Sequence, residues 1–163
     1  MSNLILNTDS YKQSHYLQYP PGTQYVNSYI EARGGNYKKT VFFGLQMFLR
    51  KCLMTPITQY DVDMASEVMK HHMPAVPFNR RGWEYILDQH GGYLPLQIFA
   101  PDEGLRIDTG NVLVQVSNTD PKVPWSTRFI ETALLRAIWY PTTVATVSRG
   151  IKDTLQSFAL QTS

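Results

Sequence analysis

The sequence lacks most of the features that assign a chain to a class at once. Cys52 is the only cysteine in 163 residues, which excludes an intramolecular disulfide and a paired-cysteine metal or redox motif. Residues 1–8 have neither the basic start nor the sustained apolar stretch of a signal peptide. No run approaches the ~20 apolar residues of a membrane span. We therefore expect a cytoplasmic protein with no membrane partner.

An excess of charge of one sign is also missing. Lys and Arg number 15 against 13 Asp and Glu, for a net charge of +2, so charge gives no reason to propose a nucleic-acid partner. Neither GxGxxG nor GxxxxGKS/T occurs, and the two familiar phosphate-binding glycine loops are absent. Small anionic ligands are not excluded, because they need only a few well-placed cations.

The composition is that of a folded domain. Hydrophobic residues make up 43% of the chain and charged residues 17%, and no repeat or Gly-, Ser- or Pro-rich linker divides it. Periodicity predicts a helix, a strand, three helices, three strands and two helices, in that order. This order lacks regular βαβ alternation and predicts an α+β fold, a small mostly antiparallel sheet packed with helices. The helices are expected over 8–16 and 40–53, from Thr58 and Asn79 onward, and over 126–139 and 142–160; the strands over 24–32 and, as a meander, over 94–99, 105–107 and 112–116.

Two groups of polar side chains favour structural roles. His71 and His72 are adjacent, so on a helix they point about 100° apart and make poor joint metal ligands. We read them as a helix end. Glu131 lies among apolar residues of a helix and is expected to be a partly buried carboxylate bonded to a neighbour.

A tyrosine-rich stretch from Thr8 to Pro21 leaves two interpretations open. It crowds tyrosines, a histidine, Asp9 and Lys12 into one helix and its exit, with few apolar side chains. It can be a surface helix capped by Asp9. Alternatively, a ring and a carboxylate are presented together to a planar polar ligand, because a tyrosine face stacks while its hydroxyl still finds a partner.

A second stretch places Arg33 at the end of a predicted strand, before a pair of glycines. Lys38 and Lys39 follow shortly afterwards. The stretch can be a solvated turn with ordinary surface cations. It can also bind phosphate, since glycine-rich backbone amides and a guanidinium fork hold phosphate oxygens.

Ordered blocks along the whole chain resemble the nicotinamide phosphoribosyltransferase family. Because several blocks occur in the family's order, the resemblance is far more specific than any one motif. The blocks are TDSYKxxHYxQYPP at 8–21, SYIEAR at 28–33, TVFFGLQ at 40–46, FNRRGWEYIL at 78–87, GYLPLQI at 92–98, GNVLVQVSNTDP at 110–121 and FIETALLRAIWYPTTVAT at 129–146.

The resemblance implies an activity and an assembly. These enzymes transfer a phosphoribosyl group from 5-phosphoribosyl pyrophosphate to nicotinamide in NAD salvage, with Mg²⁺ assisting the pyrophosphate, and work as homodimers with active sites at the interface. It also implies the N-terminal domain of a type II phosphoribosyltransferase without its α/β barrel. Residues 1–140 would form this domain and 141–163 a helix leading towards the barrel.

The family's site residues carry over at three positions. Tyr11 matches the tyrosine that packs on the nicotinamide ring from the opposite protomer, and Asp9 matches the aspartate beside the same site. Arg33 matches the arginine that reaches the phosphates across the interface. No catalytic residue and no metal ligand is assigned in this chain, and Lys38 and Lys39 have no assured counterpart.

Three functions stay open. The first is the N-terminal part of a nicotinamide phosphoribosyltransferase, partnered by a second protomer or by the barrel half. Alone it is expected to be inactive, because the family's other ring-, ribose- and phosphate-binding residues would come later. The second is a non-catalytic dimerisation or ligand-binding module. The third, a nicotinate-specific enzyme, is less favoured because the blocks fit the nicotinamide enzyme better. An exposed apolar patch is expected where the barrel would pack.

Overall fold

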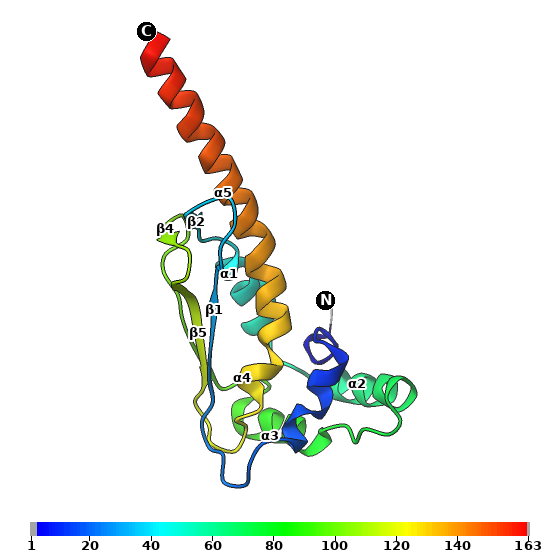
Figure 1. Ribbon diagram of the computed structural model, residues 1–163. Helices are drawn as coiled ribbons and strands as arrows, with labels where there is room; N and C mark the ends of the chain where they lie inside the picture. The colour runs from blue at the N-terminus through cyan, green and yellow to red at the C-terminus, as the bar shows by residue number, and fades with distance from the viewer. Residues whose placement is uncertain (1–2, 163) are drawn as a thin grey trace.

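Two small antiparallel sheets and a set of helices make up the computed structural model, which describes residues 3–162 (Figure 1). The predicted α+β class is confirmed. In chain order the elements are η1 (Leu4–Leu6), η2 (Ser10–Leu17), β1 (Asn27–Glu31), β2 (Lys39–Val41), α1 (Leu45–Phe48), η3 (Leu49–Leu53), α2 (Gln59–His72), α3 (Arg80–His90), β3 (Leu96–Phe99), β4 (Arg106–Asp108), β5 (Val112–Asn118), α4 (Ser126–Phe129) and α5 (Glu131–Thr162).

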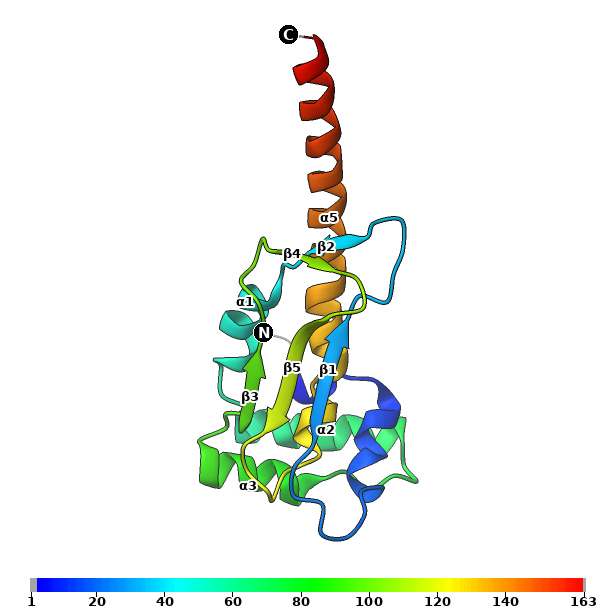
Figure 2. The same ribbon diagram turned by 60° about the vertical axis from the view of Figure 1, so that its left-hand side comes forward.

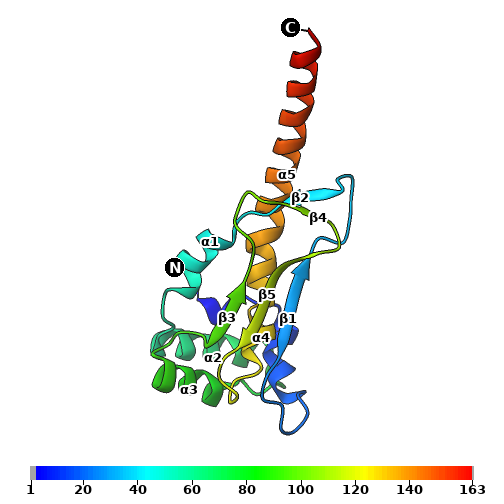
Figure 3. The ribbon, with the colours of Figure 1, turned by 90° about the vertical axis from the view of Figure 1, so that its left-hand side faces the viewer.

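Strand β5 is the centre of the larger sheet, in the order β1–β5–β3. Ile30 of β1 pairs with Val114, and Ile98 of β3 pairs with Val116. Because alternate residues of a strand share a face, Val114 and Val116 both point to the buried side. Figures 2 and 3 show the sheet lying across α4 and the first half of α5, which cover that side.

The predicted meander of three strands is wrong. β3 and β5 pair with each other, whereas β4 between them leaves the sheet and pairs with β2. Residues Lys39–Val41 were expected to lie in or beside a helix over 40–53, but they form β2. The helical part begins only after Gly44, whose φ of 108° lies in the left-handed region that favours glycine. Pairing between strands far apart in sequence leaves no trace in local periodicity.

The helices α2 and α3 begin where their capping residues predicted. Thr58 and Asp61 form a capping box, and the Asn79 side chain accepts a hydrogen bond from the Gly82 amide. Helix α2 ends at His72, which confirms the reading of the histidine pair as a helix end. Trp83 of α3 packs edge-on against Trp125 and Phe129, with ring centroids 4.8 and 4.9 Å away.

The predicted break between two C-terminal helices is wrong, because α5 runs unbroken through Pro141. Proline has no N–H to donate, so tertiary contacts must hold the helix together here. Thr142 Oγ1 accepts a hydrogen bond from the Phe43 amide at 3.1 Å, and Thr146 Oγ1 accepts one from the Val41 amide at 2.8 Å. The division expected at residues 140 and 141 falls inside this helix and stays a prediction.

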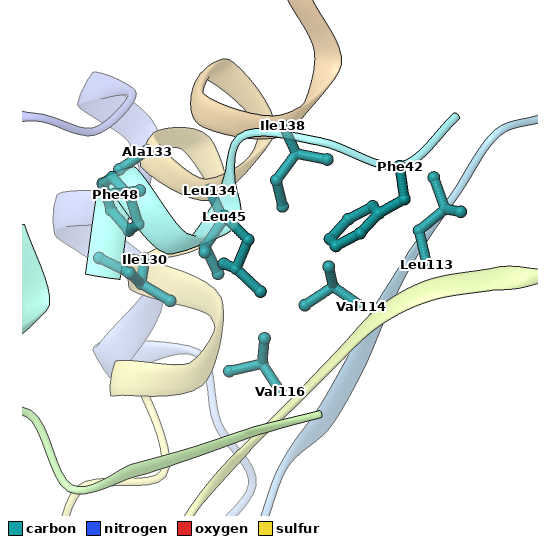
Figure 4. Close-up of a cluster of buried hydrophobic side chains, with 10 residues drawn as sticks. All are labelled: Phe42, Leu45, Phe48, Leu113, Val114, Val116, Ile130, Ala133, Leu134 and Ile138. Carbon is teal, nitrogen blue, oxygen red and sulfur yellow. The ribbon is translucent and has the colours of Figure 1, made fainter. Parts of the chain in front are cut away.

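The main core lies between the larger sheet, α1 and the first half of α5. Figure 4 shows its side chains pointing toward one another from these elements. Phe42, Val114 and Ile138 are all buried, and each such side chain contributes about 1.5–3 kcal/mol by leaving water. The core members are Phe42, Leu45, Phe48, Leu113, Val114, Val116, Ile130, Ala133, Leu134 and Ile138.

The second half of α5 extends beyond the other elements in all three ribbon views (Figures 1–3). Its apolar side chains are exposed, with fractions of 56% for Ile151, 66% for Leu155 and 63% for Phe158. These side chains form exposed apolar surface, and the prediction that the barrel would pack on such a surface stays a prediction. Within residues 3–162, no helix combines the length and apolar character needed to cross a bilayer.

Candidate functional site

The tyrosine-rich stretch folds as η2, a 3-10 helix that packs on the junction of α4 and α5. A helix was expected here, but the Asp9 side chain does not cap it. Instead, the segment is fixed by distant contacts. Thr8 Oγ1 donates to the Phe129 carbonyl at 3.0 Å, and Gln13 Nε2 donates to the Ile5 carbonyl at 2.9 Å.

The Asp9 carboxylate does not cap η2. It accepts hydrogen bonds from one side chain of η2 and one of α5. Thr132 Oγ1, on the first turn of α5, donates to Asp9 Oδ2 at 2.6 Å, and the Tyr11 hydroxyl donates to the same oxygen at 3.2 Å. The Thr132 hydrogen bond, helped by the Tyr11 bond and the charges of Arg136 and Lys12, lowers the pKa of Asp9. Asp9 is therefore an anion at neutral pH.

Tyr11 presents its ring to solvent beside this carboxylate. Its exposed fraction is 56%, and its ring centroid lies 5.2 Å from that of His15. Partial desolvation of the hydroxyl, followed by the charge and hydrogen bond of Asp9, raises the pKa of Tyr11. At neutral pH the side chain is a neutral phenol with an open face. The structure thus brings Asp9 and Tyr11 together, while their roles stay predictions.

Lys12 fixes η2 to the start of α5 through a partly buried ion pair. Its side chain is 4% exposed and forms an ion pair with Glu131, which is 39% exposed. The prediction that Glu131 is a partly buried carboxylate bonded to a neighbour is confirmed. An ammonium group this deeply buried needs a partner, since an unpaired charge there is strongly destabilising. The pair ties η2 to the start of α5, next to the Thr132–Asp9 bond.

Arg33 lies beyond the end of β1, in the connection to β2, and its side chain makes no hydrogen bond or ion pair within residues 3–162. The connection is tied down at both ends. The Gly110 amide donates to the Ala32 carbonyl at 2.8 Å, and the Thr109 amide donates to the Lys38 carbonyl at 3.0 Å. The Arg33 guanidinium is therefore free on a connection whose two ends are fixed.

A cavity of about 700 Å³ lies between this connection and α5. Arg33 lines it from the connection and Arg136 and Trp139 line it from α5, and most of the remaining lining is apolar. Arg136 also reaches the Asp9 group, because its Nη1 donates to Asn7 Oδ1 at 3.1 Å and its Nη2 lies 4.0 Å from Asp9 Oδ1. Arg136 therefore stands between the Asp9–Tyr11 pair and the cavity.

Chemically, the arrangement offers two kinds of recognition. An exposed phenol ring with a carboxylate beside it suits a flat, polar molecule that carries N–H donors. Two guanidinium groups on one cavity suit a phosphate or pyrophosphate. Among residues 3–162, no three His, Cys, Asp or Glu side chains gather in a way that could hold a metal ion.

Sequence reasoning missed Thr132 and Arg136, because both lie more than a hundred residues from the η2 stretch. The available signal was weak. The two are four residues apart on α5, so they share a face of the helix. That spacing shows a polar face but not which segment it meets.

Comparison with known proteins agrees with the family resemblance of the sequence blocks. The family model described as nicotinamide phosphoribosyltransferase, N-terminal domain, matches residues 3–98. A nicotinamide phosphoribosyltransferase of Xanthomonas campestris is 48% identical over 163 residues, which is 100% of this chain and 34% of the relative. One of Acinetobacter baylyi is 32% identical over 169 residues, 94% of this chain and 33% of the relative. The chain thus spans about a third of these relatives' length.

A solved structure agrees on the fold. The crystal structure of human nicotinic acid phosphoribosyltransferase matches with a TM-score of 0.52 at 21% identity, over 85% of this chain and 26% of that one. The expected resemblance to the N-terminal domain of a type II phosphoribosyltransferase is confirmed. The chain belongs to the nicotinamide phosphoribosyltransferase family and corresponds to its N-terminal domain.

Proposed function

We propose that this chain is the N-terminal part of an enzyme that transfers phosphoribosyl from 5-phosphoribosyl pyrophosphate to nicotinamide. The products are nicotinamide mononucleotide and pyrophosphate, in NAD salvage. The observation that carries the proposal is 48% identity over the whole chain to a relative of that name. The Asp9–Tyr11 pair and the arginine-lined cavity supply chemistry that fits both substrates.

Tyr11 and Asp9 fit the pyridine substrate. The exposed Tyr11 ring stacks on a pyridine, which is flat and polar. Asp9 is an anion because Thr132 and Tyr11 donate to it, and it lies beside the ring that would stack on the pyridine.

Arg33 and Arg136 fit the phosphoribosyl donor. Positive charge beside the pyrophosphate stabilises the negative charge that develops on it as the bond to ribose breaks. Mg²⁺ would supply further charge neutralisation at the pyrophosphate oxygens when bound. Within residues 3–162 the acidic side chains do not gather into a metal site, so we propose that the ion arrives with the substrate.

The three family positions lie on the surface, which fits a site completed by other polypeptide. Tyr11 and Arg33 are exposed and Asp9 is partly exposed, on a chain that spans about a third of its relatives. We propose that they serve an active site shared with a second protomer in a cytoplasmic homodimer. It follows that the 163-residue chain alone gives no measurable turnover, because it provides a minority of the binding groups.

A chimera tests the function directly. This chain would replace the matching first third of the Xanthomonas campestris relative, and formation of nicotinamide mononucleotide would be measured. Activity that falls sharply with Tyr11→Ala but is largely kept with Tyr11→Phe is expected, since phenylalanine keeps the stacking face.

The other readings predict different results. A folded chimera without turnover, beside an active parent, would favour the non-catalytic module. Turnover of nicotinate in preference to nicotinamide would favour the nicotinate enzyme. Formation of nicotinamide mononucleotide by the purified 163-residue chain would overturn its expected inactivity.

A further inference from the structure

Gly150 sits well inside α5, where glycine is among the poorest helix formers. The close approach of the Tyr37 ring accounts for a glycine at this position. A Cβ at this position would lie 2.8 Å from Tyr37 Cε1, 3.3 Å from the Tyr37 hydroxyl oxygen and 3.4 Å from Cζ. The first distance is one that real Cβ atoms essentially never show. The Tyr37 ring therefore occupies the space that any larger residue would need.

Tyr37 belongs to the connection that carries Arg33. Gly34 and Gly35, with φ of 144° and 149°, turn the chain between the two residues. Both ends of the connection are bonded to the β4–β5 turn, through the Ala32 and Lys38 carbonyls. Figures 1 and 2 show the connection rising beside α5. Tyr37 is the side chain that meets the helix at Gly150.

The contact lies at the edge of the cavity that holds the two arginines. Tyr37 lines this cavity with Arg33, and Arg136 and Val147 of α5 line it from the other side. Val147 and Gly150 are successive positions on one face of α5, three residues apart. If the Tyr37 ring leaves Gly150, the wall that bears Arg33 loses this contact with α5.

We propose that Gly150 and Tyr37 are positioning residues for Arg33. The ring, seated where the helix has no side chain, holds the Arg33 segment against α5 and sets the separation of Arg33 from Arg136. The inference rests on the proposed function for one point, that Arg33 and the cavity bind the phosphate end of the donor. It assigns no contact with substrate to Gly150 or Tyr37.

A double-mutant cycle on the 163-residue chain tests the contact. In a Tyr37→Ala background, Gly150→Ala is expected to raise Tm by roughly 2–4 °C, because it gains helix propensity and meets nothing. With Tyr37 present, the same change is expected to give no rise or a fall. An equal rise in both backgrounds would show that the ring does not depend on Gly150 and would overturn the inference.

Hydrogen exchange gives a second readout that does not depend on global stability. Gly150→Ala is expected to speed exchange at the Thr109 amide, which donates to the Lys38 carbonyl, while the amides of α2 keep their wild-type rates. Unchanged exchange at the Thr109 amide would count against the contact.

Kinetics of the chimera separate positioning from a structural role. Gly150→Ala is expected to raise the KM for 5-phosphoribosyl pyrophosphate several-fold and to leave the KM for nicotinamide unchanged. Tyr37→Ala is expected to do the same, whereas Tyr37→Phe, which keeps the ring, restores the low KM. Equal rises for both substrates would overturn the positioning role.

The inference and the proposed function fail in different ways. An active chimera with no coupling in the cycle overturns the inference and leaves the function intact. Strong coupling in the cycle, together with a chimera that forms no product, overturns the function. The Tyr37–Gly150 contact would then stand as a purely structural one, and the positioning role would be wrong.

Discussion

At the residue scale, the charge of Asp9 depends on a threonine far away in sequence. The Thr132 hydroxyl contributes most to the lowered pKa of Asp9. Thr132→Val is therefore expected to raise that pKa towards its ordinary value, as followed by an NMR titration of the carboxyl carbon. Thr143→Val is the matched control, since the Thr143 hydroxyl bonds the Trp139 carbonyl on the same helix.

The sign of the linked stability follows from the lowered pKa. Ionised Asp9 stabilises the fold above the ordinary carboxyl pKa of about 3.9, and this contribution is lost as pH falls through the lower folded value. Thr132→Val is expected to shrink that acid-side loss. An Asp9 titration that is identical in the two threonine variants would contradict the assignment.

The same residues show what sequence can predict about a site. Tyr11, Asp9 and Arg33 stand in ordered family blocks, so the resemblance located them. Thr132 and Arg136 gain their roles only when η2 packs on the start of α5. No local rule states which helix a segment will meet. The sequence therefore could not predict that Thr132 and Arg136 lie beside Asp9.

At the scale of the element, Gly44 joins β2 to α1 at the point where α5 carries Pro141. A Cβ on Gly44 would lie 2.3 Å from the Ala137 carbonyl oxygen and 2.9 Å from Pro141 Cγ. Gly22 also has a positive φ, of 83°, but nothing lies within 4 Å of its position. The two glycines share a backbone conformation and differ in the space around them.

Alanine at these two positions separates backbone strain from steric overlap. Gly22→Ala is expected to lower the free energy of unfolding by about 1 kcal/mol, through the left-handed conformation alone. Gly44→Ala adds overlap with a packed helix and is expected to cost about 3 kcal/mol or more. Urea unfolding measures both. Equal losses would mean that α5 gives way at Pro141 and that the packing there is loose.

Elements with local signals were predicted correctly, whereas β2 and the continuation of α5 past Pro141 were not. Thr58 and Asn79 set the starts of α2 and α3 through hydrogen bonds to residues only three positions further along the chain. By contrast, β2 exists because it pairs with β4, and α5 continues past Pro141 because Thr142 and Thr146 bond to the Val41–Phe43 segment. The Thr142 and Thr146 bonds span 99 and 105 residues, and contacts over such separations leave no trace in the local periodicity of the sequence.

At the scale of the whole molecule, the second half of α5 carries exposed apolar side chains on a chain that spans about a third of its relatives. Ile151, Leu155 and Phe158 repeat at spacings of four and three, so they form one exposed stripe. Contiguous apolar surface of this kind marks an interaction site and makes a protein self-associate. We expect the 163-residue chain to self-associate through this stripe.

Replacing the stripe with polar residues tests this expectation. Glutamine at Ile151, Leu155 and Phe158 together is expected to lower binding of a hydrophobic dye and to shift sedimentation velocity towards the monomer. Tm should change little, because the core lies at the other end of the helix. Lys152→Gln with Ser157→Gln changes the same turns but not the stripe, and should behave as wild type. Unchanged dye binding in the stripe variant would show that the dye-binding apolar surface lies in another part of the chain.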